Sequence, residues 1–140
     1  MRIKQLSIFV ENKTGRLHSI VDVLSKGNIN LRALSIADTT DFGILRVIVD
    51  DSDAAKTALA EVGVISKITD VIAVKIDDKT GGLASVLDAL SDSGISIEYM
   101  YAFLGREAGR ALMVLKSNDD DAAEATLTAA GIALTEQSEI

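Results

Sequence analysis

The amino-acid sequence predicts an α+β fold in which one β-α-β-β-α-β unit occurs twice. Three observations lead to this prediction: an internal repeat, an apolar period that changes in the same order in both copies, and a length of 140 residues. That length suits one ordinary domain or two very small ones. Modules of about 70 residues would bury little core alone and would gain stability by packing together.

A shift of 66 residues aligns the first half of the chain with the second. It aligns Asn12-Lys13-Thr14-Gly15-Arg16-Leu17 with Asp78-Lys79-Thr80-Gly81-Gly82-Leu83, and it aligns Gly43 with Gly109 without a gap. Two residues are inserted near residues 118–120, after which a shift of 68 aligns the remainder. A constant offset indicates two copies of one unit, so we predict modules at residues 1–68 and 69–140.

Each copy begins with a strand that leads into an amphipathic helix. Apolar residues alternate along both strands, at Leu6, Ile8 and Val10 and at Ile72, Val74 and Ile76. Apolar residues then recur at i, i+3, i+4 and i+7 from Leu17 and from Leu83, which is the spacing of one helix face. We expect Gly27 and Gly94 to end these helices as left-handed C-terminal caps.

The rest of each copy predicts a hairpin, a second helix and a short strand. The hairpin strands are residues 29–37 and 44–49 in the first copy and residues 95–104 and 111–115 in the second. Turn residues at 38–41 and 105–109 separate them. Helical spacing starts at Ala55 and Ala123, and the final strands are residues 64–68 and 132–135.

This order of elements is typical of a ferredoxin-like module, with four antiparallel strands and two helices on one face. No linker rich in Gly, Ser or Pro separates the copies. We therefore expect two modules that are held close and joined side by side.

Composition excludes several functions. The chain has 14 Lys and Arg against 21 Asp and Glu, a net charge of −7 that disfavours nucleic acid and anionic membrane surfaces as partners. It has no Cys and a single His, so no thiol nucleophile, catalytic triad or multi-histidine metal site is expected. We predict no catalysis and no cofactor. Without a membrane-length apolar stretch or a secretory signal, a cytoplasmic location is expected.

The charge is divided unevenly between the copies. Residues 1–68 contain nine basic and eight acidic residues, whereas residues 69–140 contain five and 13. The copies should therefore present different electrostatic surfaces. We interpret the acidic stretch at residues 119–121 as solubilising.

The loop after the first strand of each copy is the candidate binding element. A helix begins there at or next to Gly15 and Gly81. Helix N-termini offer backbone amides and a positive dipole end to a carboxylate, and glycine leaves no Cβ in the path of a ligand. The residues also allow capping alone, with no ligand, through polar side chains of the loops: Asn12, Thr14, Asp78 and Thr80.

The order of elements and the polar-x-x-Gly-x-Leu loops resemble the ACT domain, the small regulatory module of amino-acid metabolism. Over its whole length the chain resembles stand-alone tandem ACT-domain proteins. The resemblance is carried by Asn12-Lys13-Thr14-Gly15-Arg16-Leu17, Ala33-Leu34-Ser35-Ile36-Ala37-Asp38, Asp41-Phe42-Gly43-Ile44-Leu45-Arg46 and Tyr99-Met100-Tyr101-Ala102-Phe103. The family usually has Pro before the loop glycine, where this chain has Thr14 and Thr80, so looser loops are expected.

The resemblance implies a site for a free amino acid at the interface between two ACT modules. Its residues would be Asn12, Thr14, Gly15, Arg16 and Leu17, then Asp78, Thr80, Gly81, Gly82 and Leu83, and, from facing strands, Asn30, Leu31 and Ser96. Loop amides would bind the carboxylate, and Asn30, Ser96 or backbone carbonyls would accept from the ammonium. Glu11, Asp77 or Asp78 would add negative charge near the ammonium.

Arg16 and Gly82 occupy the same position in the two loops. Arg16 either clamps a carboxylate or lies in solvent. A site with Gly82 would depend on backbone donors and leave more room. The two sites of one chain are therefore expected to differ.

These features predict a non-catalytic regulatory protein that signals by changing the packing of modules or subunits. The resemblance implies a homodimer, and a separate metabolic enzyme is a candidate target. The alternative is an assembly module that has lost ligand binding.

Overall fold

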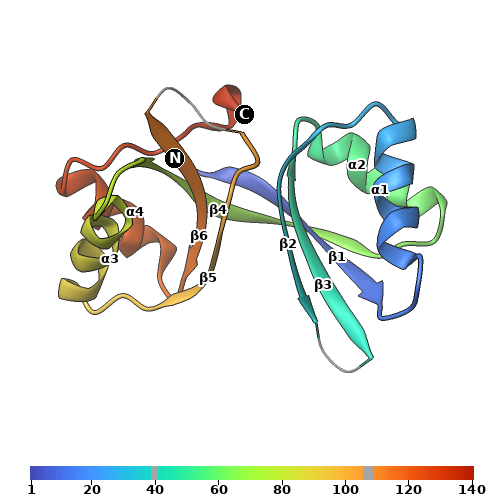
Figure 1. The fold of residues 1–140 in the computed structure, drawn as a ribbon, viewed down its shortest axis with the longest axis horizontal. Helices are drawn as coiled ribbons and strands as arrows, with labels where there is room; N and C mark the ends of the chain where they lie inside the picture. Colours follow the sequence, from blue (N-terminus) through green and yellow to red (C-terminus); the bar gives the residue numbers. More distant parts are fainter. Residues whose placement is uncertain (39–40, 106–108) are drawn as a thin grey trace. The chain divides into compact units, whose positions relative to one another are not determined.

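The computed structural model describes residues 1–38, 41–105 and 109–140. The chain divides into two compact units: Lys4–Thr69, here the first unit, and Asp70–Ile140 with Met1–Ile3, here the second unit. Both follow the predicted order of strands and helices (Figure 1). The predicted α+β class with two ferredoxin-like modules is confirmed. The predicted turns at 38–41 and 105–109 fall partly outside the described residues.

The first unit contains three strands, two helices and the start of a fourth strand. These are β1 (Ile3–Glu11), α1 (Arg16–Lys26), β2 (Leu31–Asp38), β3 (Phe42–Val49), α2 (Ser52–Glu61) and β4 (Ser66–Asp77). Antiparallel pairing gives the order β2-β3-β1. On the side of β1 away from β3, the Phe9 amide donates to the Ile65 carbonyl at 3.2 Å. The chain entering β4 therefore lies beside the end of β1.

Strand β4 differs from the prediction of separate strands at residues 64–68 and 72–76. It is one strand of 12 residues. The polar pair Thr69-Asp70 does not break it, because neither residue introduces the positive φ of a glycine or the missing donor of a proline.

The predicted apolar faces form the core of the first unit. Leu6, Ile8 and Val10 of β1 pack against Ile20 and Leu24 of α1 and against residues of β3 and α2. Both helices lie on one face of the sheet (Figure 1). Leu17, the first member of the predicted stripe, is instead exposed at the start of α1.

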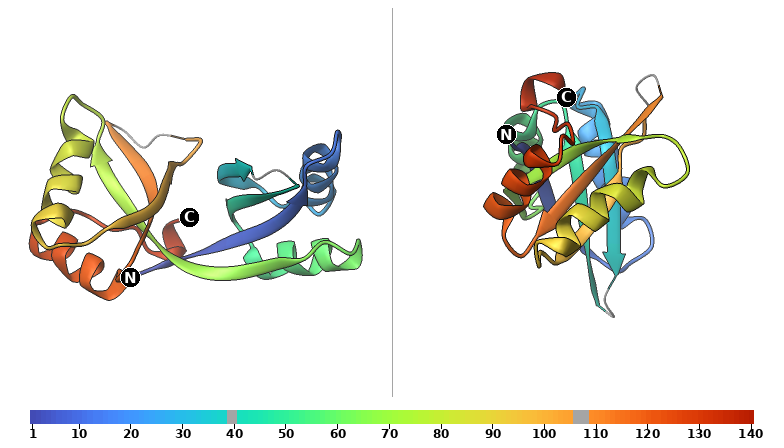
Figure 2. Two further views of the ribbon diagram at one scale, coloured as in Figure 1. Left: turned by 90° about the horizontal axis from the view of Figure 1, so that it is seen from below. Right: turned by 90° about the vertical axis from the view of Figure 1, so that its left-hand side faces the viewer.

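The second unit repeats this arrangement with the remaining part of β4. Its other elements are α3 (Gly82–Asp92), β5 (Ile97–Ala102), β6 (Arg110–Ser117), α4 (Asp120–Ala129) and the short 3-10 helix η1 (Gln137–Glu139). The strand order is β4-β6-β5. The predicted strand at 132–135 is reduced to a bridge between Leu134 and Val74. Helices α3 and α4 lie on one side of the sheet (Figure 2) and share a core with it.

The ends of the first helices correct one prediction. Gly94 has the left-handed conformation expected of a C-terminal cap (φ 70), but Gly27 does not (φ −80). Asn28 takes that conformation instead, with φ 57. Under the 66-residue shift Asn28 aligns with Gly94, and asparagine is one of the few side chains that tolerate this backbone region. Alignment of the two copies therefore predicts the position of the left-handed cap of α1 correctly, whereas the presence of Gly27 does not.

Candidate functional site

The two strand-to-helix loops have the same backbone hydrogen bonds. In each loop the second amide after the strand donates to the carbonyl of the last strand residue, and an amide in the first turn of the helix donates to the carbonyl of the loop glycine. In the first loop the amides of Lys13, Arg16 and Ser19 donate to the carbonyls of Glu11, Lys13 and Gly15 at 2.8, 3.2 and 2.9 Å. In the second loop the amides of Lys79, Gly82 and Ser85 donate to the carbonyls of Asp77, Lys79 and Gly81 at 2.9, 3.1 and 3.1 Å.

Glycine is the N-cap of both helices. Gly15 and Gly81 have φ values of 85 and 84, in the left-handed region that glycine occupies without steric cost. Most helices have an N-cap side chain that accepts from first-turn amides, and a glycine cannot do so. The cap position itself thus leaves the helix N-terminus open to an outside acceptor.

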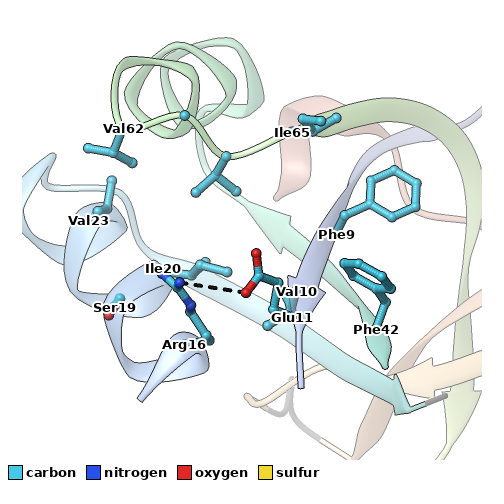
Figure 3. Close-up of a pocket in the computed structure, with 12 residues that line it drawn as sticks. Phe9, Val10, Glu11, Arg16, Ser19, Ile20, Val23, Phe42, Val62 and Ile65 are labelled. Atoms are coloured by element: carbon cyan, nitrogen blue, oxygen red, sulfur yellow. Dashed lines mark ion pairs between the residues drawn. The ribbon is translucent and has the colours of Figure 1, made fainter. Parts of the chain in front are cut away.

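A pocket of about 430 Å³ lies next to the first loop, entirely within the first unit (Figure 3). It is bounded by the end of β1, by α1 and by residues 62–65. Its lining residues are Phe9, Val10, Glu11, Arg16, Ser19, Ile20, Val23, Phe42, Val62, Gly63, Val64 and Ile65. Most of these are apolar, and Arg16 and Glu11 are the charged members.

Arg16 and Glu11 point toward each other at one edge of the pocket (Figure 3). Their Nη2 and Oε2 atoms are 3.6 Å apart, an ion pair without hydrogen-bond contact. Lys13 Nζ lies 3.1 Å from the same Glu11 oxygen. The hydrogen bond and charge of Lys13, and then the charge of Arg16, lower the pKa of Glu11. The pocket therefore presents a cation and an ionised carboxylate beside apolar walls.

The second unit has a pocket at the equivalent place, with a volume of about 230 Å³. Its lining residues are Lys75, Ile76, Asp77, Lys79, Gly82, Ser85, Val86, Arg110, Gly131, Ile132 and Ala133. Under the repeat, Lys75, Asp77 and Gly82 replace Phe9, Glu11 and Arg16. Ala133 replaces Ile65.

Gly82 does not leave the second pocket with more room, so that expectation is wrong. A Cβ built on Gly82 would lie 2.1 Å from the carbonyl oxygen of Asp77. That carbonyl occupies the space into which a side chain would extend. The second pocket is also the smaller of the two, at about 230 Å³ against about 430 Å³.

The second pocket also differs in charge. Lys75 Nζ is paired with Glu139 Oε1 at 3.1 Å, and only 17% of the Lys75 side chain is exposed. The backbone amide of Glu136, followed by Lys75, lowers the pKa of Glu139. Arg110 Nε of β6 lies 3.9 Å from Asp77 Oδ1. The cations in this pocket are Lys75 of β4, Arg110 of β6 and Lys79 of the loop, so none comes from the helix position that supplies Arg16.

Asn30, Leu31 and Ser96, the site residues predicted from facing strands, follow the C-terminal ends of α1 and α3. The Asn30 amide donates to Asp50 Oδ1, and the Ser96 amide donates to Asn118 Oδ1, each at 3.0 Å. Leu31 begins β2. The loop residues, in contrast, precede the N-terminal ends of these helices. A single unit therefore brings the loop residues together but does not bring them to Asn30, Leu31 or Ser96. Their joint site stays a prediction.

The sequence analysis missed the apolar part of the first pocket. Phe9 was assigned to the first strand, Phe42 only to a motif of the family resemblance, Val62 to the second helix, and residues 64–65 to the final strand of the first copy. Phe9 offered a weak signal, since it is a large apolar residue on the face of β1 opposite Leu6, Ile8 and Val10.

Two further properties concern the described ranges 1–38, 41–105 and 109–140. No helix there is long and apolar enough to cross a bilayer. Within the same ranges no group of three or more His, Asp or Glu side chains is placed to hold a metal ion.

The fold and its paired loops define a class: a duplicated ferredoxin-like chain with a polar loop and a pocket at the start of the first helix of each unit. The sequence profile of the ACT domain pair matches residues 1–139. The chain belongs to this family of regulatory modules.

Solved structures support the same fold. The crystal structure of protein BT0572 from Bacteroides thetaiotaomicron is 43% identical, with a TM-score of 0.91 over 99% of this chain and 94% of that chain. The ligand-free regulatory subunit of aspartate kinase from Thermus thermophilus is 16% identical, with a TM-score of 0.64 over 91% and 89%. The corresponding Thermus flavus subunit is 17% identical, with a TM-score of 0.61 over 91% and 90%. Among curated protein sequences, none matches the chain.

Proposed function

We propose that this chain is a non-catalytic regulatory protein that binds a free amino acid at the loop preceding α1. The facing pair of Arg16 and Glu11 at a pocket of about 430 Å³ carries the proposal. Membership of a family of regulatory modules supports it, as does the fold shared with the aspartate kinase regulatory subunits.

The pair suits the two charged groups of an α-amino acid. Arg16 has the planar fork of donors that matches a carboxylate, and amides of the first turn of α1 add further donors. Glu11 is a suitable acceptor for the ammonium group. Because its pKa is lowered, the Glu11 carboxylate stays charged when the pH falls into the range where glutamate normally protonates.

Regulation would follow from linkage between the ligand and the packing of modules. The family resemblance predicts that Asn30, Leu31 and Ser96 contribute from a neighbouring module. If so, the ligand stabilises that packing by its binding free energy. A homodimer in the cytoplasm and a separate metabolic enzyme as the target complete the proposal.

Calorimetry and thermal unfolding with each of the 20 common amino acids test this function. A ligand at 100 times its dissociation constant should stabilise the protein by about 2.7 kcal/mol. If no amino acid gives heat or a shift in melting temperature, the proposal is wrong.

Assembly without a ligand is the second candidate. Phe9, Phe42 and Ile65 are each more than half exposed beside the pocket, a feature that also suits a protein interface. Serine substitutions at these positions that change the sedimentation coefficient, in a protein that binds no amino acid, would favour assembly.

A further inference from the structure

The rim of the first pocket is unusually apolar and exposed. Phe9, Phe42, Val62 and Ile65 expose 53, 55, 56 and 71% of their surfaces and come from three separate parts of the chain. Scattered apolar residues are normal on a protein surface, but a cluster around one pocket marks a binding site. The inner wall continues the apolar surface with Val10, Ile20 and Val23.

Charge is confined to one part of the pocket. Of its 12 lining residues, Glu11 and Arg16 alone carry charge. Ser19 adds a hydroxyl, but this already donates to the Gly15 carbonyl at 2.9 Å. A ligand that fits has a carboxylate and an ammonium close together and no polar group beyond them.

We infer that the first pocket takes one α-amino acid with an uncharged, apolar side chain, and that the equivalent pocket of the second unit does not take it. This inference rests on the proposed function and narrows it to a ligand class and a stoichiometry. The carboxylate binds Arg16, the ammonium binds Glu11, and the side chain lies among the aliphatic and aromatic residues.

The second pocket keeps a carboxylate, Asp77, and a guanidinium, Arg110, but its guanidinium comes from a strand and its apolar rim is missing. Gly82 supplies no guanidinium in place of Arg16, and Lys75 replaces Phe9. Ala133 and Ala130 replace Ile65 and Val62, which removes most of the rim. Its volume of about 230 Å³ also falls below the range of roughly 300–1,000 Å³ usual for ligand sites.

Isosteric ligand pairs test the side-chain class. L-leucine should bind at least about tenfold more tightly than L-asparagine, and L-valine more tightly than L-threonine, because aliphatic walls leave a polar side chain without partners. Titration calorimetry should give one site per chain. Tighter binding of the polar member of both pairs, or two equal sites per chain, would overturn the inference.

Matched variants test the place. Arg16→Gln and Ile65→Ser should each weaken L-leucine binding by about tenfold or more. Their counterparts Arg110→Gln and Ala133→Ser, in the second pocket, should leave affinity unchanged. All four positions are exposed or half-exposed, and melting temperatures without ligand will verify that each variant folds.

The remaining outcomes separate this inference from the proposed function. If some amino acid binds but only the second-unit variants weaken it, the inference fails and the proposed function stands. If Ile65→Ser changes the sedimentation coefficient and leaves affinity unchanged, the rim is an interface between copies and the inference again fails. If no amino acid binds, both fail.

Discussion

The two units share the backbone of the loop and differ in the side chains around it. Both loops close with the same hydrogen bonds around a left-handed glycine. Arg16 aligns with Gly82 and Phe9 with Lys75, however, so one pocket is large and mainly apolar while the other is small and charged. The two units therefore share the backbone conformation of the loop but not the chemical character of the pocket. The loop conformation depends on backbone hydrogen bonds, whereas the pocket depends on side chains that differ between the units.

A second contrast lies at the start of α2 and α4. In the second unit the Asp120 carboxylate accepts from the Ser117 amide and hydroxyl at 2.9 and 2.8 Å and pairs with Lys116. Strand pairing places Ile48, Val49 and Ser52 at these positions of the first unit, so the two-residue insertion precedes β6 and does not lie near residues 118–120 as the sequence predicted. Asp120 is only 8% exposed, so its interpretation as a solubilising residue is wrong. The same helix start thus depends on a buried charge in one unit only.

Alanine substitution at the aligned positions 16 and 82 should give the largest difference in stability between the two units. We expect Gly82→Ala to lower the free energy of unfolding by about 3 kcal/mol, because its Cβ would overlap the Asp77 carbonyl. Arg16→Ala removes a half-exposed side chain and should change stability by about 0.5 kcal/mol or less. Urea denaturation measures both. Equal effects would show that the loops do not differ as described.

The buried carboxylate should give the next largest effect. We expect Asp120→Asn to lower the free energy of unfolding by about 2 kcal/mol, since Lys116 and Ser117 lose a charged partner. Ser52→Ala, at the aligned position, should cost about 1 kcal/mol or less. Chemical denaturation at neutral pH compares the two.

Asp120 also predicts how stability depends on pH. Burial raises the pKa of this carboxyl, but the hydrogen bonds from Lys116 and Ser117 outweigh it and the net pKa is lowered. Its stabilisation is therefore present above the unfolded pKa of about 3.9 and is lost as pH falls through the lower folded value. Stability curves should converge for wild type and Asp120→Asn in this acid range. A constant difference at all pH values would contradict the assignment.

The loop glycines should respond alike in both units. Gly15→Ala and Gly81→Ala each place a Cβ at positive φ in open space, so each should cost about 1 kcal/mol without a clash. Thermal unfolding of the two variants measures this cost. A difference of more than about 1 kcal/mol would mean that the loops are not equivalent.

The smallest predicted effect concerns the helix ends. Asn28→Gly should stabilise the protein by about 0.5 kcal/mol, because glycine relieves the positive φ at that position. Gly94→Asn, the reverse change in the second unit, should destabilise it by a similar amount. Precise melting temperatures at matched concentration will resolve the sign, and two shifts of the same sign would refute the pairing.

The sequence predicted the elements well where neighbouring residues determine them. The alternation in β1 and the helical stripe of α1 depend on residues close in sequence, and both were confirmed except at Leu17, which is exposed. The prediction of Gly27 as the left-handed cap was wrong because Asn28, the next residue, takes the positive φ there. Two strands were predicted where β4 is one, because residues 69 and 70 are polar but continue the extended backbone.

By itself the sequence determined the duplication, the order of strands and helices, and the glycine at the start of each first helix, since these follow from periodicity and local turn chemistry. The tertiary structure alone decided that Phe9, Phe42 and residues 62–65 surround one pocket, and that the Asp77 carbonyl lies where a side chain at position 82 would begin. Those contacts join residues distant in sequence, and their geometry depends on how strands pair and helices pack. A pattern within a short stretch of sequence does not predict that geometry.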